Sequence, residues 1–380
     1  MRFLLTCHDA GGTVPPLLAL AAGLRGRGHD VAVLAQPSVR ARAEAAGCAF
    51  RAFDSLPDYD HRRALEEQLD LTVEAIAGHR IGDELVRAAG DVAADLVVVD
   101  ANLAGALAAA ETLDVPSAVL LHSVYRTFVD VWFGPLWPLL ADLVNATRER
   151  FGLAAADGWP GVFAGHDRLV AVVPPSFDPP VEHPPATLRH AGFLVAPGGG
   201  DPPPWPDGDG PRVLVGLSTT YQHHEALLQS IVDGLAGLDV RAVVTTGGSV
   251  DAAALRAPGP VLVVERAPHG ALLADADVMV THAGLGSVAA ALSAGVPLVC
   301  TPIDRDQPLN AERVAAVGAG LSLGGEPSAG DVAGAVERVA GDPAFRASAR
   351  AMARESVAAG GAAGAAADLE GLAQTTRRVR

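Results

Sequence analysis

The sequence DVMVTHAGLGSVAAALSAGVPLVCTPIDRDQPLN, from Asp277 to Asn310, decides the fold of this chain. Its apolar run Val278–Thr281 has the length of a buried strand, and a glycine-rich turn follows it. A helix ending near Gly295 and a second strand, Pro297–Thr301, are predicted next. Pro308 predicts the first turn of a further helix. Strand, helix and strand in this order are typical of a parallel α/β sheet.

The turn after the first strand has the features of an anion site. His282 stands where the strand ends, and Gly284 and Gly286 allow a ligand to approach the backbone without meeting a Cβ atom. Ser287 is expected to begin the helix and adds a hydroxyl. The N–H groups at a helix N-terminus carry a partial positive charge that suits a diphosphate.

A second polar pair, Asp306 and Gln307, stands at the mouth of the next predicted helix. A carboxylate beside an amide offers acceptors and a donor to neighbouring sugar hydroxyls. Each feature also has a purely structural interpretation, because a histidine can satisfy a strand end and an aspartate can cap a helix. Their combined order and spacing predict a site for a nucleotide-activated sugar.

Composition limits the classes of protein. The 380 residues, 49% of them hydrophobic, suit two domains, and the net charge of −16 without a basic tract argues against nucleic-acid binding. No apolar run predicts a membrane span or a signal peptide. All 28 basic residues are arginine, which excludes lysine chemistry. Cys7, Cys48 and Cys300 fit thiols in a reducing cytoplasm, and no spacing predicts a metal site.

Two α/β segments are separated by a Pro/Gly-rich stretch, 198–211. Before it, strands are predicted at Arg2–Thr6, Val31–Gln36, Leu96–Asp100, Ser117–His122 and Leu169–Pro174. After it, they are predicted at Arg212–Leu217, Val240–Thr245, Val261–Val264, Val278–Thr281 and Pro297–Thr301. We therefore expect two Rossmann-like domains, 1–197 and 212–380, facing each other across a cleft, with a C-terminal helix in the second.

The segment from His282 to Gly320 resembles the donor-binding signature of the family 1 glycosyltransferases with the GT-B fold, and in particular the bacterial enzymes that modify natural products. The resemblance implies diphosphate contacts from His282, Gly284, Gly286 and Ser287, and sugar contacts from Asp306 and Gln307. Where the family has a W-x-P-Q stretch at the nucleobase, this chain has Arg266 and His269, and a guanidinium can also stack on a base. Ser218 and Thr219 resemble a loop that reaches the phosphates.

The resemblance implies a general base near the acceptor hydroxyl, and here the sequence departs from the family. In G-H-x-x-P of many members a histidine fills this role, whereas the matching position is Thr13, which cannot act as a base at neutral pH. Asp9 or His8 from the same loop are the first alternatives. His122, at the end of the predicted strand Ser117–His122, is another. A readily ionised acceptor with little need of a base is the third.

Aromatic residues are concentrated between Tyr125 and Phe163, which suits a bulky, flat, apolar acceptor, although a packed subcore explains the same pattern. The residues expected at the acceptor are His122, Tyr125, Phe128, Trp132, Phe133 and Trp137.

The sequence thus predicts a cytoplasmic, inverting, metal-independent transferase. Its co-substrate would be a dTDP- or UDP-sugar, and the expected substrates are a dTDP-deoxysugar and a secondary-metabolite aglycone such as a polyketide. The alternatives are a sugar-nucleotide epimerase on the same fold, or an auxiliary protein that binds the donor without catalysis. No other cofactor is implied, and a monomer and a homodimer both fit.

Overall fold

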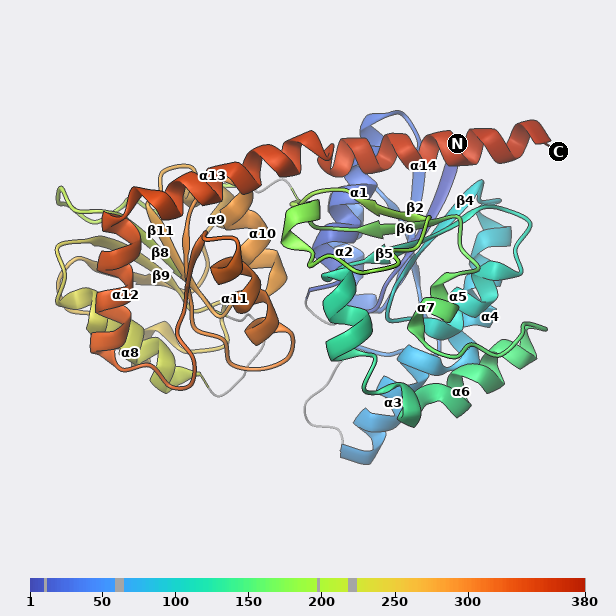
Figure 1. Cartoon of the computed structure of the whole chain (residues 1–380), viewed down its shortest axis with the longest axis horizontal. Helices are drawn as coiled ribbons and strands as arrows, with labels where there is room; N and C mark the ends of the chain where they lie inside the picture. Colours follow the sequence, from blue (N-terminus) through green and yellow to red (C-terminus); the bar gives the residue numbers. More distant parts are fainter. Residues whose placement is uncertain (10–11, 59–64, 197–198, 218–223, 380) are drawn as a thin grey trace. The chain divides into compact units, whose positions relative to one another are not determined.

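The computed structural model describes residues 1–9, 12–58, 65–196, 199–217 and 224–379 (Figure 1). The chain forms two compact units. Met1–Ala196 and Ala359–Arg380 make up the N-terminal unit, and Pro197–Ala358 make up the C-terminal unit. None of the described helices is long and apolar enough to cross a membrane.

The N-terminal unit is built on one parallel sheet in the order β3-β2-β1-β4-β5-β6-β7. Its strands are β1 (Arg2–Thr6), β2 (Asp30–Ala35), β3 (Ala49–Ala52), β4 (Leu96–Asp100), β5 (Ser117–Leu121), β6 (Arg168–Ala171) and β7 (Leu188–His190). Its helices are α1 (Val14–Gly26), α2 (Arg40–Ala45), α3 (Leu65–Ala77), α4 (His79–Asp91), α5 (Ala104–Glu111), α6 (Trp137–Arg150), α7 (Trp159–Phe163) and α14 (Gly361–Val379), with short turns η1 (Pro37–Val39), η2 (Thr127–Trp132) and η3 (Pro175–Phe177).

The C-terminal unit has a second parallel sheet in the order β10-β9-β8-β11-β12-β13. Its strands are β8 (Arg212–Gly216), β9 (Arg241–Thr245), β10 (Val261–Val264), β11 (Val278–Thr281), β12 (Leu298–Cys300) and β13 (Gly320–Ser322). Its helices are α8 (Glu225–Ala236), α9 (His269–Leu273), α10 (Leu285–Ser293), α11 (Gln307–Ala316), α12 (Ala329–Gly341) and α13 (Pro343–Ala358), with the short turn η4 (Ala252–Ala254).

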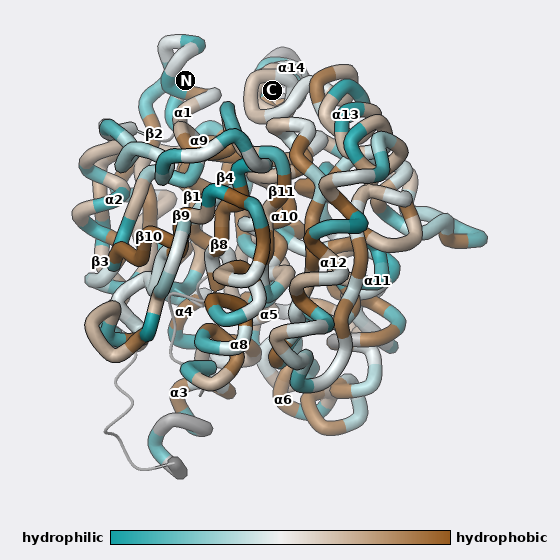
Figure 2. Tube along the Cα trace, turned by 90° about the vertical axis from the view of Figure 1, so that its left-hand side faces the viewer, coloured by the Kyte–Doolittle hydropathy of each residue, from teal (hydrophilic) through white to brown (hydrophobic). Residues whose placement is uncertain are grey.

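The central strands match the predicted ones to within a few residues because they are continuous apolar runs. All five residues of β4 and of β5 are buried, as expected for strands covered by helices on both faces. In Figure 2, hydrophobic (brown) stretches of the tube lie at the labelled strands β8 and β11 of the C-terminal unit. The sequence missed β3, β7 and β13, which lie at sheet edges and carry partly exposed residues. These three edge strands lack the unbroken apolar run by which the other strands, including the edge strand β10, were predicted.

The last helix differs from the predicted domain assignment. Residues 359–380 belong to the N-terminal unit, whereas the sequence places them in a C-terminal domain 212–380. Helix α14 packs on α1, where a Cβ atom on Gly23 would lie 2.6 Å from the carbonyl oxygen of Ala362. Arg168 Nε also donates to Asp368 at 2.8 Å. An Ala-rich helix carries little information about which partner it will cover, so composition could not decide this.

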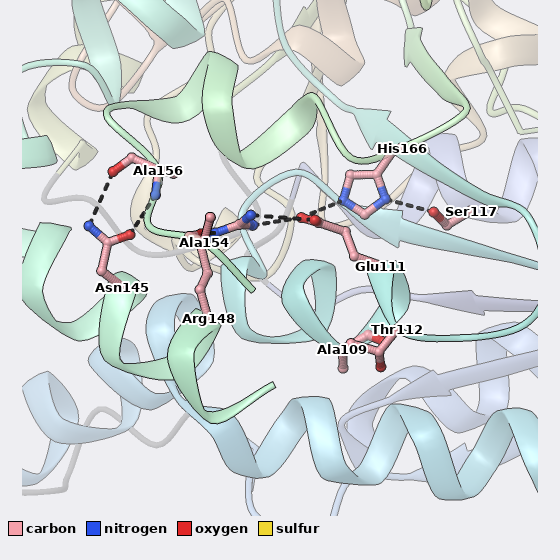
Figure 3. Close-up of polar contacts among 9 residues, drawn as sticks. All are labelled: Ala109, Glu111, Thr112, Ser117, Asn145, Arg148, Ala154, Ala156 and His166. Atoms are coloured by element: carbon pink, nitrogen blue, oxygen red, sulfur yellow. Dashed lines mark hydrogen bonds and ion pairs between the residues drawn. The ribbon is translucent and has the colours of Figure 1, made fainter. Parts of the chain in front are cut away.

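A buried polar network joins α5, α6 and β5 in the N-terminal unit (Figure 3). Arg148 pairs with Glu111 through NH1 at 2.6 Å, and the Oγ atom of Ser117 lies 2.8 Å from Nδ1 of His166. Nε2 of His166 lies 4.0 Å from the Glu111 carboxylate. Burial, followed by the charge of Arg148, lowers the pKa of His166 to about 3. The imidazole is therefore neutral in the folded protein.

Because His166 is buried and neutral, we expect the N-terminal unit to lose stability in mild acid. Its pKa of about 3 lies below the ordinary value, so that at low pH the unfolded chain binds a proton that the folded chain does not. The stabilisation is complete above about pH 6.5 and falls by up to about 1.4 kcal/mol per pH unit below it. We expect this residue alone to remove about 2 kcal/mol by about pH 5.

Urea unfolding followed by tryptophan fluorescence at pH 7.5 and pH 5.0 measures this loss, since Trp137 and Trp159 belong to the N-terminal unit. His166→Gln removes the titrating group and retains a polar side chain. The variant should lose less stability than the wild type over this interval, although it is less stable at pH 7.5. Equal losses in the two proteins would show that His166 does not control the acid response.

Candidate functional site

The polar residues of the C-terminal unit gather where the strand order reverses. Strands β8 and β11 are neighbours although two other strands of the sheet, β9 and β10, separate them in sequence. Thr281 at the end of β11 pairs with Gly216 of β8 and with Cys300 of β12. The loops that follow these three strands therefore emerge side by side. Such a switch point at the carboxyl ends of parallel strands is where doubly wound folds bind ligands.

Helix α10 begins at this point, two residues earlier than predicted. Gly284 is its N-cap, Leu285 its first residue and Gly286 its second. The Ser287 N–H bonds to the carbonyl oxygen of Gly284 at 2.9 Å, while the amides of the first residues of a helix have no intrahelical acceptor. Gly286 is exposed, and a Cβ atom added to it would meet nothing within 4 Å. This helix end is open to an anionic ligand.

His282 is buried against this turn. A Cβ atom on Gly284 would lie 2.6 Å from Nε2 of His282, so the glycine is required by the ring. Burial, then the nearby His224, lowers the pKa of His282 to about 4, although a hydrogen bond with the backbone of Gly216 favours the charged ring. At neutral pH the imidazole is uncharged and has one N–H. Since the backbone of Gly216 is a partner for that N–H, His282 contributes to the shape of the turn more than to its charge.

Two non-glycine residues with positive φ border the site. Ala283 has φ of 64° and is fully buried, and Arg305 has φ of 61° and is exposed. The left-handed conformation costs about 1–2 kcal/mol for such residues, so neighbouring contacts must hold them in place. The positive charge of Arg305 is one of the influences that keep the pKa of His282 low, which brings this guanidinium into the electrostatic surroundings of the turn.

The predicted sugar pair lies at the start of α11. Asp306 is the N-cap but its side chain does not cap the helix. Its Oδ2 atom instead accepts from Nδ2 of Asn310 at 2.9 Å. Gln307 is buried, and its Oε1 atom accepts from the amides of Ile303 at 2.9 Å and Asp304 at 3.1 Å. Gln307 therefore shapes the preceding loop, and Asp306 is the more accessible of the two.

Asn310 is a residue of this site that the sequence did not single out. Its Nδ2 atom also donates to the carbonyl oxygen of Ala283 at 3.0 Å, and the side chain is buried. It thus bonds to both halves of the predicted site. Its position one helical turn after Asp306 is the signal that could have indicated the contact.

The predicted nucleobase residues have different surroundings. His269 is the first residue of α9; its Nε2 atom lies 2.8 Å from Oγ1 of Thr245, and burial lowers its pKa. Arg266 is exposed and pairs with the adjacent Glu265 at 3.3 Å. An exposed pair of this kind holds the guanidinium weakly and leaves it free to stack on a ligand. Ser218 and Thr219 lie outside the described residues.

Histidines line this edge of the sheet. His224 is buried and its Nε2 atom lies 3.2 Å from Oγ of Ser249. Burial is the main cause that lowers the pKa of His224, His269 and His282. This edge of the sheet therefore presents neutral imidazoles. Within the described ranges, no group of three or more His, Cys, Asp or Glu residues is arranged to hold a metal ion.

The N-terminal sheet has its own switch point, between β1 and β4. Asp100, fully buried at the end of β4, lies with Oδ2 2.8 Å from Nδ1 of His122, which follows β5. The two atoms lie within ion-pair distance but are not aligned as a hydrogen bond. Oδ1 of Asp100 accepts from the amide of Asn102 at 2.9 Å, and Nδ2 of Asn102 lies 3.4 Å from Nε2 of His122. A partly exposed imidazole is thus paired with a buried carboxylate.

His8 lies beside this pair. Burial lowers its pKa, and the charges of Asp100 and His122 act on it in opposite directions. Its Nδ1 atom is buried without a hydrogen-bond partner among the described residues. The sequence missed Asp100, although an aspartate that ends the buried run LVVVD was a usable signal.

Asp9 and Thr13, the other predicted residues of this loop, have structural contacts. Oδ2 of Asp9 accepts from NH2 of Arg42 and, at 3.1 Å, from Oγ of Ser38. The hydroxyl of Thr13 donates to the carbonyl oxygen of His8, and Thr13 is buried. Both residues fasten the loop after β1, and neither is placed as a free base.

The aromatic cluster is mainly packing. Phe128 and Phe133 are buried and stack with centroids 4.5 Å apart, and Trp159 contacts Phe133 edge-on at 5.2 Å. Trp137 is half-buried and packs edge-on against Trp159 at 5.8 Å. These contacts favour the subcore interpretation for Phe128 and Phe133. Trp132 belongs to η2, and its side chain is outside the described part.

Tyr125 is the aromatic residue that lines a pocket. The pocket has a volume of about 560 Å³, and its walls include Arg126, Val129, Pro160 and Pro180. This volume falls within the range of small-molecule sites, about 300–1,000 Å³. The amide of Tyr125 bonds to Asp178 at 3.0 Å, which fixes this end of the segment after β5.

Comparisons with known proteins agree with this geometry. Residues 229–372 match the family described as Erythromycin biosynthesis protein CIII-like, C-terminal domain. The chain is 30% identical to 4'-demethylrebeccamycin synthase of Lentzea aerocolonigenes, covering 98% of this chain and 99% of that protein.

Solved structures show the same architecture. CalG4, the calicheamicin glycosyltransferase, is 27% identical with a TM-score of 0.81 over 98% of this chain and 97% of that chain. The glycosyltransferase VinC, solved in complex with dTDP, is 22% identical with a TM-score of 0.75 over 99% of this chain and 100% of that chain, and shows the fold alone. The chain therefore belongs to the family 1 glycosyltransferases of bacterial natural-product pathways, which have the GT-B fold.

Proposed function

We propose that the protein transfers a sugar from a dTDP-activated donor to a bulky natural-product aglycone, with inversion at the anomeric carbon. The observation that carries the proposal is the open N-terminus of α10, placed at a switch point and bonded through Asn310 to the carboxylate of Asp306. A diphosphate and a sugar are the ligands that suit this pair of features. Thymidine as the nucleoside of the donor is proposed by analogy with VinC, a protein of the same fold that was solved in complex with dTDP.

The diphosphate would be held by backbone amides and by Arg305. The first amides of α10 point their N–H groups at the ligand, and the helix dipole favours its negative charge. His282, uncharged and bonded to Gly216, keeps the turn in shape. Arg305 is the cation next to Asp306 and acts electrostatically on the same turn. As the bond to the sugar breaks, charge accumulates on the diphosphate, and these groups stabilise it.

The acceptor would be activated by His122. Its imidazole takes the proton of the attacking hydroxyl, while the buried Asp100, 2.8 Å away, stabilises the imidazolium that forms. The hydroxyl oxygen then bonds to the anomeric carbon, and the diphosphate leaves from the opposite face. Of the bases that the sequence offers, His122 has an orienting carboxylate and a partly exposed ring. Asp9 is engaged by Arg42 instead.

The acceptor would lie against the segment that follows β5, where Tyr125 borders the pocket. The pocket, about 560 Å³ in volume, is larger than a single sugar requires and has room for a polycyclic aglycone.

Transfer is tested by incubating the enzyme and dTDP-glucose with a panel of phenolic and polyketide aglycones. Mass spectrometry should show a product heavier by one sugar, together with an equal amount of released dTDP. Conversion of the donor at the same rate without an acceptor would favour the epimerase. Tight donor binding without any product would favour the auxiliary protein.

His122→Ala should lower kcat by about 10²–10⁴-fold, the usual contribution of a general base, and leave the Kd of dTDP unchanged. Asp100→Asn should act in the same direction. His29→Ala is a matched control, because His29 is also buried near a carboxylate, Glu370 at 3.6 Å, but lies at the start of β2. Turnover of His122→Ala equal to that of His29→Ala would remove His122 as the base.

Gly286→Ala should stabilise the free protein and weaken donor binding. The added Cβ has open space in a helix, where alanine is favoured over glycine by up to about 1 kcal/mol, but it stands where a phosphate would approach the α10 amides. Gly334→Ala in α12 is the control, since that glycine is also exposed with nothing within 4 Å of an added Cβ.

Both variants should raise Tm, and only Gly286→Ala should raise the Kd of dTDP, by about tenfold or more. Calorimetric titration with dTDP measures the difference. Equal dTDP affinity in the two variants would mean that the diphosphate does not contact this helix end.

A further inference from the structure

One buried amide connects the two parts of the donor site. Nδ2 of Asn310 donates to the carbonyl oxygen of Ala283 at 3.0 Å and to Oδ2 of Asp306 at 2.9 Å. Asn310 is 1% exposed, and it belongs to α11, whereas Ala283 lies in the turn that opens α10. The same nitrogen atom therefore bonds both to the turn that is expected to bind the diphosphate and to the carboxylate that is expected to bind the sugar.

Both partners of Asn310 need an external constraint. Ala283 has a φ of 64°, a conformation that an alanine adopts only when its surroundings hold it there. The carboxylate of Asp306 makes no hydrogen bond to the amides of α11. Without another partner, this side chain could adopt several rotamers. A hydrogen bond from Asn310 removes this freedom on each side.

We propose that Asn310 is a positioning residue that sets the spacing between the diphosphate cradle and the sugar-binding carboxylate. This proposal rests on the donor site described under the proposed function. Asn310 touches neither phosphate nor sugar; it directs one oxygen of Asp306 inward and leaves the other oxygen, Oδ1, oriented for a sugar hydroxyl. Loss of Asn310 should therefore impair recognition of the sugar more than recognition of the nucleotide.

A purely structural role would have a different signature. If Asn310 only stabilised the fold, its removal would lower the affinity for dTDP and for dTDP-glucose by the same factor. If it positions Asp306, the advantage of dTDP-glucose over dTDP should shrink, and KM for the donor should rise while binding of dTDP persists.

The test compares the Kd values of dTDP and dTDP-glucose in wild type, Asn310→Ala and Asn310→Asp. Asn310→Ala should weaken dTDP-glucose about tenfold more than dTDP. Asn310→Asp should be worse, because it places a second carboxylate against Asp306 and against a carbonyl oxygen. Asn145→Ala is a matched control: this asparagine of α6 also bonds to backbone atoms, those of Ala156 at 2.8 and 3.1 Å (Figure 3), but in the N-terminal unit. It should leave both Kd values unchanged.

A double-mutant cycle with Asp306→Ala identifies the route of the effect. If Asn310 acts through Asp306, Asn310→Ala should not change the ratio of the two Kd values further in the Asp306→Ala background. Should Asn310→Ala fail to fold, Asn310→Ser retains a shorter donor and is assessed by the same ratio.

The outcomes separate this inference from the proposed function. A wild type that binds neither dTDP nor dTDP-glucose overturns the proposed function itself. A wild type that binds both, with a ratio of Kd values that Asn310→Ala leaves unchanged, overturns only the positioning role.

Discussion

The reversal of strand order in each parallel sheet is the constraint on which the rest of this structure depends. Between β8 and β11, and between β1 and β4, neighbouring strands send their following loops to opposite faces, and polar groups can emerge there without being covered by a crossover helix. The continuous apolar strands fix the register at both places, so that Thr281 stands beside Gly216 and Asp100 beside Leu120. Asp100 and His282 lie directly at these strand ends, and His122 and Asp306 follow the neighbouring strands β5 and β12.

Charge is distributed differently at the two switch points. On the C-terminal unit, buried imidazoles are neutral and the positive potential comes from a helix end and from Arg305, which is a suitable environment for a ligand that brings its own negative charge. On the N-terminal unit, a buried carboxylate accompanies a partly exposed imidazole, which suits a group that must gain a proton and return it. This division matches a reaction in which one substrate loses a diphosphate and the other loses a proton.

The sequence predicts the central strands and the glycine-rich turn before α10 well, because both depend on local patterns, the apolar run and the glycines before a helix. It predicts poorly whatever depends on contacts between distant segments. The edge strands β3, β7 and β13, the packing of α14 on the N-terminal unit and the pairing of Asp100 with His122 are of this kind. Phe128 and Phe133 were expected at the acceptor but stack on each other. The sequence of an aromatic-rich segment is the same whether its rings pack together or face a ligand. The double role of Asn310 could not be read from spacing, because the bond to Ala283 crosses from one helix to the start of another.

The central claim is that the first amides of α10 bind the diphosphate, and amide hydrogen exchange tests it most directly. Exchange of the N–H groups of Leu285 and Gly286 should be measured by NMR with and without saturating dTDP. We expect exchange at both positions to slow by about tenfold or more when dTDP is bound, because the phosphate oxygens accept from these groups. If dTDP binds while exchange at Leu285 and Gly286 is unchanged and protection develops elsewhere, the diphosphate site has been assigned to the wrong helix.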